Sequence, residues 1–200
     1  MRKVGLTGNI GSGKSLVSEI FSILGIPVYH ADQESKKFLA DPVVKEKILT
    51  LFGKGVFSES SEIDRTALAT RVFSDDKALA DLDSILHPMV LHDFTQWCKA
   101  FREYPYIIHE AAIIFESGIA GLFDKIIHVS CPKETAIERV MKRDGIDGSS
   151  VLQRIRFQME DYKKAGLSDF VINNDGSEMI IPQVLSIHRL LSEICAKGND

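Results

Sequence analysis

Apolar and polar segments alternate along the chain in a way that predicts five short strands separated by helices. Most of the strand candidates are continuous runs rich in valine and isoleucine, which is typical of strands that are covered on both faces. The five runs are Lys3–Gly8, Pro27–Asp32, Tyr106–Ala112, Asp124–Cys131 and Phe170–Asn174. Strands that alternate with helices predict an α/β fold, with a five-stranded parallel sheet, helices on both faces and right-handed crossovers.

Helices are indicated where apolar side chains recur every three or four residues. The first such stretch covers residues 15–24, and Gly25 follows it as a stop signal. Pro88 stands where it would be the first residue of a helix over residues 88–101. Residues 132–141 and 178–196 carry the same periodicity, and residues 33–39 also look helical.

Two intervals are too long or too polar for this simple alternation. Residues 33–103 lie between the second and third strands and look mostly helical. They predict an inserted subdomain within a single domain that covers residues 1–200. Residues 142–168 are polar and mixed in charge, so we interpret the stretch 139–168 as a mobile lid.

The composition excludes several classes of protein. The chain has 200 residues and a net charge of −4, which argues against binding to nucleic acid or membranes through general basicity. Its most apolar region, residues 107–123, is interrupted by charged residues, so we expect no membrane span. The three cysteines form no CxxC pair, which favours a reducing compartment. We therefore expect a cytoplasmic monomer or small homo-oligomer with no nucleic-acid or membrane partner.

Directly behind the first strand, Gly8-Asn9-Ile10-Gly11-Ser12-Gly13-Lys14-Ser15 matches the phosphate-binding pattern G-x-x-x-x-G-K-[ST]. Glycines let backbone N–H groups converge on phosphate oxygens, and the following helix presents its free amides and positive dipole end to the anion. We expect Lys14 to reach the β- and γ-phosphates and the Ser15 hydroxyl to bind Mg²⁺. The residues predicted to bind ATP are Gly8, Gly11, Ser12, Gly13, Lys14, Ser15 and Leu16.

Such a loop occurs both in regulatory GTPases and in small-molecule kinases. A GTPase would need a D-x-x-G stretch, which the chain lacks, and a guanine-binding N-K-x-D, for which Asn173-Asn174-Asp175 lacks the lysine. The dinucleotide pattern G-x-G-x-x-G also fails, because Leu16 occupies the place of the third glycine. A kinase is therefore favoured, and a nucleoside, a nucleotide or a small alcohol could be its acceptor.

A kinase needs a carboxylate for the acceptor hydroxyl and cations for the transferring phosphoryl group. Asp32 ends the second predicted strand, where ligands of parallel sheets bind, so it is the predicted base; the alternative is a helix N-cap. His30 is either a second participant or a buried histidine. Glu110 is either a supporting magnesium ligand or a partner for a neighbouring group. Arg139 and Arg143 share a helical face and are predicted to neutralise the phosphates.

In its motifs and their order, the chain resembles the dephospho-coenzyme A kinase family over nearly its whole length. The motifs are the glycine loop, His30-Ala31-Asp32, Ile63–Leu68, His87-Pro88, Phe115-Glu116, Arg139–Asp144, the Arg154 and Gln158 pair, and Ser168–Gly176. The family usually has Asp-Ala-Asp in place of His30-Ala31-Asp32, and a threonine in place of Leu16. It commonly has an acidic stretch with a proline where this chain reads Glu110–Glu116.

The resemblance implies ATP- and Mg²⁺-dependent phosphorylation of the ribose 3′-hydroxyl of dephospho-coenzyme A, which gives coenzyme A and ADP. It implies the nucleotide-kinase type of the P-loop nucleoside triphosphate hydrolase fold, in which the insertion 33–103 binds the acceptor and the stretch 139–168 is a lid. Asp32 would activate the hydroxyl. The residues that it adds to the site are Arg65 and His87 on the acceptor side, and Asn174 and Gly176 in a loop near the adenine.

Several of these residues also have structural explanations. Arg65 could be an exposed residue at the start of a helix. His87 could be a buried histidine that caps the helix begun by Pro88. Phe94 and Trp97 fit a core stripe better than a base-stacking site.

Overall fold

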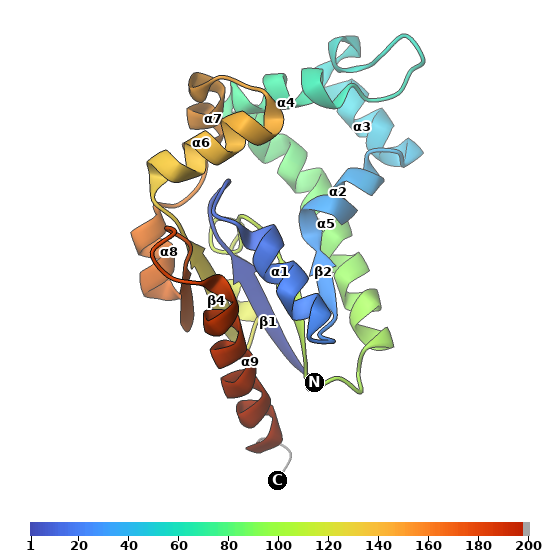
Figure 1. Ribbon diagram of the computed structural model, residues 1–200. Coiled ribbons are helices and arrows are strands. Elements are labelled where there is room, and N and C mark those ends of the chain that lie inside the picture. The colour runs from blue at the N-terminus through green and yellow to red at the C-terminus, as the bar shows by residue number, and fades with distance from the viewer. Residues whose placement is uncertain (198–200) are drawn as a thin grey trace. The chain divides into compact units, whose positions relative to one another are not determined.

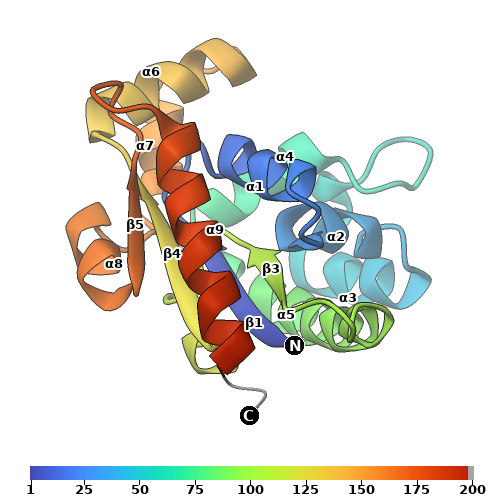
Figure 2. The same ribbon diagram turned by 60° about the horizontal axis from the view of Figure 1, so that its bottom comes forward.

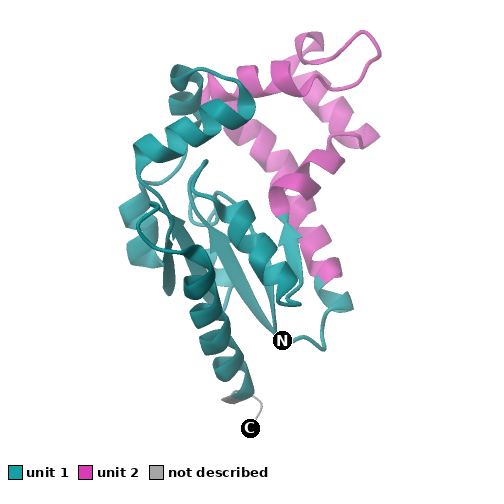
Figure 3. Cartoon of the chain, viewed as in Figure 1, with its two compact units in different colours: residues 1–30, 98–200 teal, residues 31–97 magenta. Residues whose placement is uncertain are grey.

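The computed structural model describes residues 1–197, so residues 198–200 of the predicted domain lie outside its described part. The contacts within the chain divide it into two compact units (Figure 3). The first unit contains Met1–His30 together with the chain from Cys98 onward, and the second contains Ala31–Trp97. The second unit is therefore an insertion in the sequence of the first.

A five-stranded sheet forms the centre of the first unit (Figure 1). Its strands are β1 (Arg2–Thr7), β2 (Val28–His30), β3 (Tyr106–Glu110), β4 (Lys125–Ser130) and β5 (Phe170–Asn173). They follow the order β2-β3-β1-β4-β5, and every neighbouring pair is parallel. This sheet confirms the predicted α/β class and all five predicted strands. The second strand ends at His30 instead of Asp32, because the chain turns into a helix at Ala31.

Helices cover both faces of this sheet, as predicted. The helices α1 (Lys14–Ile23) and α9 (Ile180–Lys197) lie side by side on one face (Figures 1 and 2), where Phe21 and Leu191 pack against Ile127 in one buried cluster. Side chains alternate along a strand, so His128 of β4 points to the other face, where it is bonded to Asp161 of α8 (Asp161–Leu167). The remaining elements of this unit are η2 (Ala120–Leu122), α6 (Lys133–Asp144) and α7 (Gly148–Ile155).

His109 lies in the middle of the sheet, in β3, and is only 1% exposed. Its ring stacks on that of Tyr29 with 5.3 Å between the centroids and lies 5.2 Å from that of Phe123. Gly5 is its neighbour in β1, and a Cβ at Gly5 would come within 3.2 Å of the Phe123 ring. Burial lowers the pKa of His109 from 6.5 to about 4, because the charged ring would lose its hydration.

This shift predicts a pH-dependent stability. Between pH 6.5 and about 4 the unfolded chain holds a proton at His109 that the native protein does not. The free energy of unfolding therefore falls as the pH falls through this window, by about 3 kcal/mol in all. Replacing His109 by phenylalanine keeps an aromatic ring in the stack and removes the titration, so urea unfolding should depend less on pH. Equal slopes in the variant and the wild type would contradict this assignment.

The second unit consists of helices around a hydrophobic core of its own, which includes Ile48, Leu68 and Leu82. Asp41 and Asp64 each cap a helix by accepting hydrogen bonds from backbone N–H groups of its first turn. The elements are α2 (Ala31–Phe38), α3 (Pro42–Phe52), η1 (Lys54–Val56), α4 (Arg65–Phe73) and most of α5 (Asp76–Ala100).

The helix predicted to begin at Pro88 begins instead at Asp76, and α5 runs through the proline without ending. Proline lacks the N–H that a helix interior needs. The apolar face nevertheless continues across it, because Leu86 and Val90 on either side are both buried. The free energy gained by burying this apolar face thus outweighs the preference of proline for the first turn of a helix. The alternative role of His87 as a buried helix cap is also wrong: the side chain is 36% exposed, and its Nε2 lies 3.5 Å from Oδ1 of Asp83.

Other expectations about composition and core agree with the structure. The three cysteines, Cys98, Cys131 and Cys195, are free and buried. Phe94 is buried as well, in agreement with a core stripe. Within residues 1–197, no helix combines the length and the apolar character that crossing a bilayer requires.

Candidate functional site

The glycine loop joins the end of β1 to the start of α1, which is the strand–loop–helix context that its sequence pattern requires. Gly11 and Gly13 have φ angles of 79° and 99°, which glycine adopts far more readily than other residues. A Cβ at Gly11 would strike the backbone carbonyl of Ala136 in α6, and one at Gly13 would strike the side-chain amide of Asn174. Neighbouring segments of the protein therefore require both glycines.

The polar groups of the loop are arranged for an anion. Lys14 is 8% exposed, and its Nζ donates to the carbonyl of Gly8 at 2.9 Å, so the ammonium group is folded back over the loop. The buried hydroxyl of Ser12 has no hydrogen-bond partner within the described part of the chain. A phosphate oxygen would satisfy this hydroxyl and would also face the positive N-terminal end of α1, whose N-cap Gly13 offers no side-chain cap. The loop therefore fits a polyphosphate.

The space around Gly11 predicts a selective loss of nucleotide binding. Gly11→Ala should raise the Kd of a non-hydrolysable ATP analogue by about tenfold to a hundredfold, because the new Cβ forces the loop away from α6. Gly25→Ala is the matched control: Gly25 has a similar φ of 83°, but open space surrounds its Cβ position. Both alanines bear about 1 kcal/mol of left-handed strain. Calorimetric titration of both variants is the measurement, and equal affinities would contradict the prediction.

Asn174 and Arg139 support the loop from the carboxyl end of the sheet. The Nδ2 of Asn174 donates to the carbonyl of Ser12 at 2.7 Å, and Nη2 of Arg139 donates to the carbonyl of Asn174 at 3.2 Å. Nη1 of Arg139 also lies 3.3 Å from Sγ of Cys131. Two predicted site residues, Asn174 and Arg139, thus lie at the glycine loop. Asn174 bonds the loop backbone and Arg139 bonds Asn174, contacts that the sequence did not reveal.

Arg143 is turned to Asp144 rather than to the loop. Its Nε and Nη2 donate to the two carboxylate oxygens of Asp144 at 2.7 and 3.1 Å, and this hydrogen-bonded pair raises the pKa of Arg143. The side chain is 61% exposed, so a role at the phosphates would require this pair to open. Gly176 lies after β5 with a φ of 91° and open space at its Cβ position.

Glu110 and His30 face each other at the ends of two neighbouring strands. Nδ1 of His30 lies 3.0 Å from Oε2 of Glu110, which is 6% exposed. Glu110 is also paired in register with Leu6 of β1, the strand that leads into the glycine loop. Among residues 1–197, no group of three or more His, Cys, Asp or Glu side chains could hold a metal by itself. A cation here would need further oxygen ligands, such as phosphate oxygens and the hydroxyl of Ser15.

Asp32, Arg65 and His87 belong to the second unit. Asp32 is exposed and is the second residue of α2, so the alternative that it is the N-cap of this helix is wrong. A carboxylate in the first turn is nevertheless favoured by the positive end of the helix dipole. Arg65 is the exposed first residue of α4, directly after the N-cap Asp64. The chemical roles of these three residues stay predictions.

Among known proteins, the dephospho-CoA kinase family matches residues 2–179 of this chain. The chain belongs to this family. A dephospho-CoA kinase of Bacteroides fragilis is 39% identical over 203 residues, which cover 99% of this chain and 98% of the relative. One of Aquifex aeolicus is 37% identical over 195 residues, covering 96% of this chain and 98% of the relative. The activity is therefore that of a dephospho-CoA kinase, the final step of coenzyme A biosynthesis, and kinase activity implies ATP as a substrate.

Solved structures agree with this family assignment. A crystal structure from Thermus thermophilus superposes with a TM-score of 0.82 at 32% identity, covering 94% of this chain and 96% of that one. A dephospho-CoA kinase from Campylobacter jejuni superposes with a TM-score of 0.68 at 25% identity, covering 99% and 98%. A shikimate kinase from Acinetobacter baumannii shares the fold alone, with a TM-score of 0.53 at 11% identity and coverage of 96% and 94%. The predicted P-loop kinase fold is confirmed.

Glu116 and Lys164 had no predicted role in the site, yet they are connected to the glycine loop through Met159. Glu116 and Lys164 form an ion pair of 2.8 Å, and the fully buried Lys164 also donates to the carbonyl of Ala112 at 2.7 Å. Burial lowers the pKa of Lys164, although the partner Glu116 opposes this shift. In the sequence, Glu116 and Gln158 appear in family motifs, whereas Lys164 looks like one of many exposed cations.

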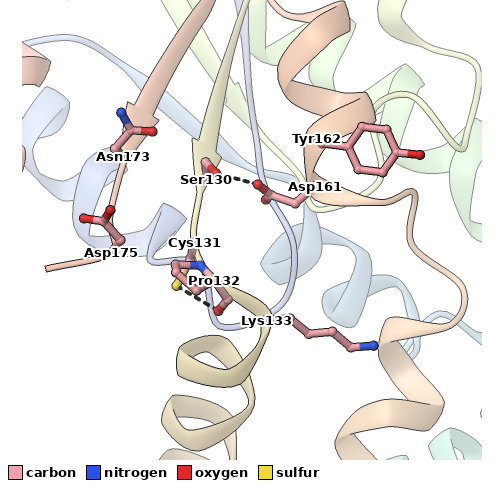
Figure 4. Close-up of a pocket in the computed structure, with 8 residues that line it drawn as sticks. All are labelled: Ser130, Cys131, Pro132, Lys133, Asp161, Tyr162, Asn173 and Asp175. Atoms are coloured by element: carbon pink, nitrogen blue, oxygen red, sulfur yellow. Dashed lines mark hydrogen bonds between the residues drawn. The ribbon is translucent and has the colours of Figure 1, made fainter. Parts of the chain in front are cut away.

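A pocket of about 360 Å³ lies at the ends of β4 and β5 (Figure 4). Its wall includes Asp161, whose carboxylate accepts from Ser130 at 2.5 Å and is bonded to His128 at 2.9 Å. Of the described residues, Asn173 and Asp175 on either side of Asn174 line it, but none of the predicted site residues does. The pocket is thus separate from the glycine loop, and its acidic wall is already engaged in internal hydrogen bonds.

Proposed function

We propose that this kinase transfers the γ-phosphoryl group of MgATP to the ribose 3′-hydroxyl of dephospho-CoA, which yields coenzyme A and ADP. The observation that carries the proposal is the glycine loop, where a buried hydroxyl of Ser12, the ammonium group of Lys14 and the positive N-terminal end of α1 are all suited to a polyphosphate. Membership of the family supports the choice of acceptor.

In the proposed step, the 3′-hydroxyl oxygen attacks the γ-phosphorus in line. A new O–P bond forms while the bond from the γ-phosphorus to the β–γ bridging oxygen breaks, and ADP leaves with that electron pair. Asp32 orients the hydroxyl and accepts its proton. The charge of Lys14 and the loop amides stabilise the negative charge that develops on the phosphate oxygens.

Mg²⁺ suits the oxygen donors that this chain offers near the loop. We assign the Ser15 hydroxyl, exposed in the first turn of α1, to the metal, and the buried carboxylate of Glu110 to a supporting position. His30 would hold Glu110 in place through the hydrogen bond between them. When bound, the ion would neutralise phosphate charge and orient the triphosphate.

We assign acceptor binding to the predicted subdomain 33–103, with Arg65 and His87 as its polar contacts. The stretch 139–168 is the proposed lid, in which Arg139 and Arg143 neutralise the phosphates. Its part before Gln158 would close and exclude water, while its end stays anchored through the ion pair of Lys164 with Glu116. Asn174 and Gly176 would lie on the adenine side. We also propose a cytoplasmic monomer or small homo-oligomer, for which the free cysteines are supporting evidence of a reducing compartment.

A panel of acceptors tests the proposal. ADP release is measured with dephospho-CoA, with nucleosides, with nucleotides, with small alcohols and with no acceptor. We expect release with dephospho-CoA alone, and phosphorus NMR should locate the new phosphate on the 3′-oxygen. Release with another acceptor would indicate a different P-loop kinase, and slow hydrolysis independent of any acceptor would indicate a nucleotide switch.

A further inference from the structure

We propose that Gln158 is a positioning residue that holds the crest of the glycine loop in its nucleotide-binding shape. The crest consists of Asn9 and Ile10, in the half of the loop that follows β1. Gln158 and Met159 lie between α7 and α8, far away in the sequence. The proposal deepens the proposed function, because it concerns the same phosphate site, and it rests on that function only for the kinetic readout.

Two hydrogen bonds join this connecting segment to the crest. The backbone N–H of Ile10 donates to Oε1 of Gln158 at 2.9 Å. The side-chain amide of Asn9 donates to the carbonyl of Met159 at 3.2 Å. The crest residues lie outside both β1 and α1, so the regular hydrogen bonds of strand and helix do not hold them. Gln158 supplies the backbone N–H of Ile10 with the partner that regular structure would otherwise provide, and Met159 holds the side chain of Asn9.

The connecting segment is itself anchored in the interior. The N–H of Met159 donates to Oε1 of Glu116 at 2.7 Å, and the same carboxylate is paired with the fully buried Lys164. Lys164 in turn donates to the carbonyl of Ala112, just beyond β3. Movement of the segment away from the crest would strain a buried ion pair, which is costly to break. The crest is therefore tied to a rigid part of the kinase.

The loop is consequently held from two directions. Asn174, after β5, binds the carbonyl of Ser12 on one side, and Gln158 binds the N–H of Ile10 on the other. Binding of an anion by backbone amides needs those amides to be oriented beforehand. Gln158 keeps the Ile10 amide occupied, and the N–H of Ser12 donates to the carbonyl of Asn9 at 3.0 Å, so the crest is held in one backbone shape. Loss of the Gln158 oxygen should free the crest and weaken ATP binding, without a matching effect on the binding of dephospho-CoA.

The test compares three substitutions. Gln158→Met has nearly the same length and lacks the acceptor oxygen, whereas Gln158→Glu retains an oxygen at that position. Gln153→Met, on the exposed surface of α7, is the matched control. The measurements are amide hydrogen exchange at Ile10 without nucleotide, the Kd of a non-hydrolysable ATP analogue, and the KM values for ATP and dephospho-CoA.

In Gln158→Met we expect exchange at Ile10 to accelerate at least about tenfold, and the Kd of the analogue and the KM for ATP to rise about tenfold. The KM for dephospho-CoA and the melting temperature should stay near the wild-type values. Gln158→Glu should keep the protection of Ile10, and Gln153→Met should match the wild type. Unchanged exchange and affinity in Gln158→Met, or a loss that only follows reduced stability, would overturn the proposal. Exchange and analogue binding need no phosphoryl transfer, so failure of the acceptor assignment would be recognised separately.

Discussion

Replacing Asp32 by asparagine is expected to lower kcat by about a hundredfold to ten-thousandfold. The asparagine amide has almost the same shape as the carboxylate but cannot accept the proton of the attacking hydroxyl. Binding of ATP should change little, because the groups suited to the phosphates, Lys14 and the amides of α1, lie in the glycine loop and the helix behind it. Steady-state turnover and calorimetric titration with a non-hydrolysable ATP analogue measure the two quantities.

Two comparisons make this result specific. Glu34→Gln, in the same helix α2, removes an ion pair with Lys37 and should leave kcat unaltered. His30 is the competing base, and its ring is hydrogen-bonded to Glu110. If His30 were the base, His30→Asn would abolish turnover while Asp32→Asn would have a small effect. Normal turnover in Asp32→Asn would remove Asp32 from the mechanism.

Replacing Lys164 by methionine is expected to lower the free energy of unfolding by about 3–5 kcal/mol. The ammonium group is fully buried and bonded to both Glu116 and the carbonyl of Ala112. Its removal leaves a carboxylate with a side chain only 17% exposed and a partly buried carbonyl that both lose a charged donor. Urea unfolding followed by circular dichroism measures the change.

The neighbouring lysine provides the control. Lys163 is paired with Glu160 in the same region, but that pair is open to solvent, so Lys163→Met should change stability little. Adding Glu116→Gln to Lys164→Met should restore part of the lost stability, because it removes the uncompensated charge. Equal urea midpoints for the two lysine variants would show that the buried Lys164 does not contribute the expected free energy of unfolding.

Local patterns were sufficient to predict the elements that carry the chemistry. The five strands were predicted because buried parallel strands are continuous runs of apolar residues. The glycine loop was predicted because its residues serve a backbone conformation and an anion at once. The predicted helix start at Pro88 is wrong. The preference of proline for the first turn of a helix contributes less free energy than burial of the apolar face on both sides of Pro88. Asp32 was placed at the end of a strand, although the chain is already helical from Ala31.

By itself, the sequence determined the order of strands and helices, the phosphate-binding loop and the family, because each of these depends on residues close together in the chain or on motifs in a fixed order. Only the tertiary structure decided what holds the loop: Gln158 on Ile10, Asn174 on Ser12, and Lys164 on Glu116. The partners of the first two pairs come from distant parts of the chain, and each of those pairs includes a backbone group, which is the same in every residue type other than proline. The amino-acid sequence therefore does not reveal these contacts, which form only when the fold brings the two segments together.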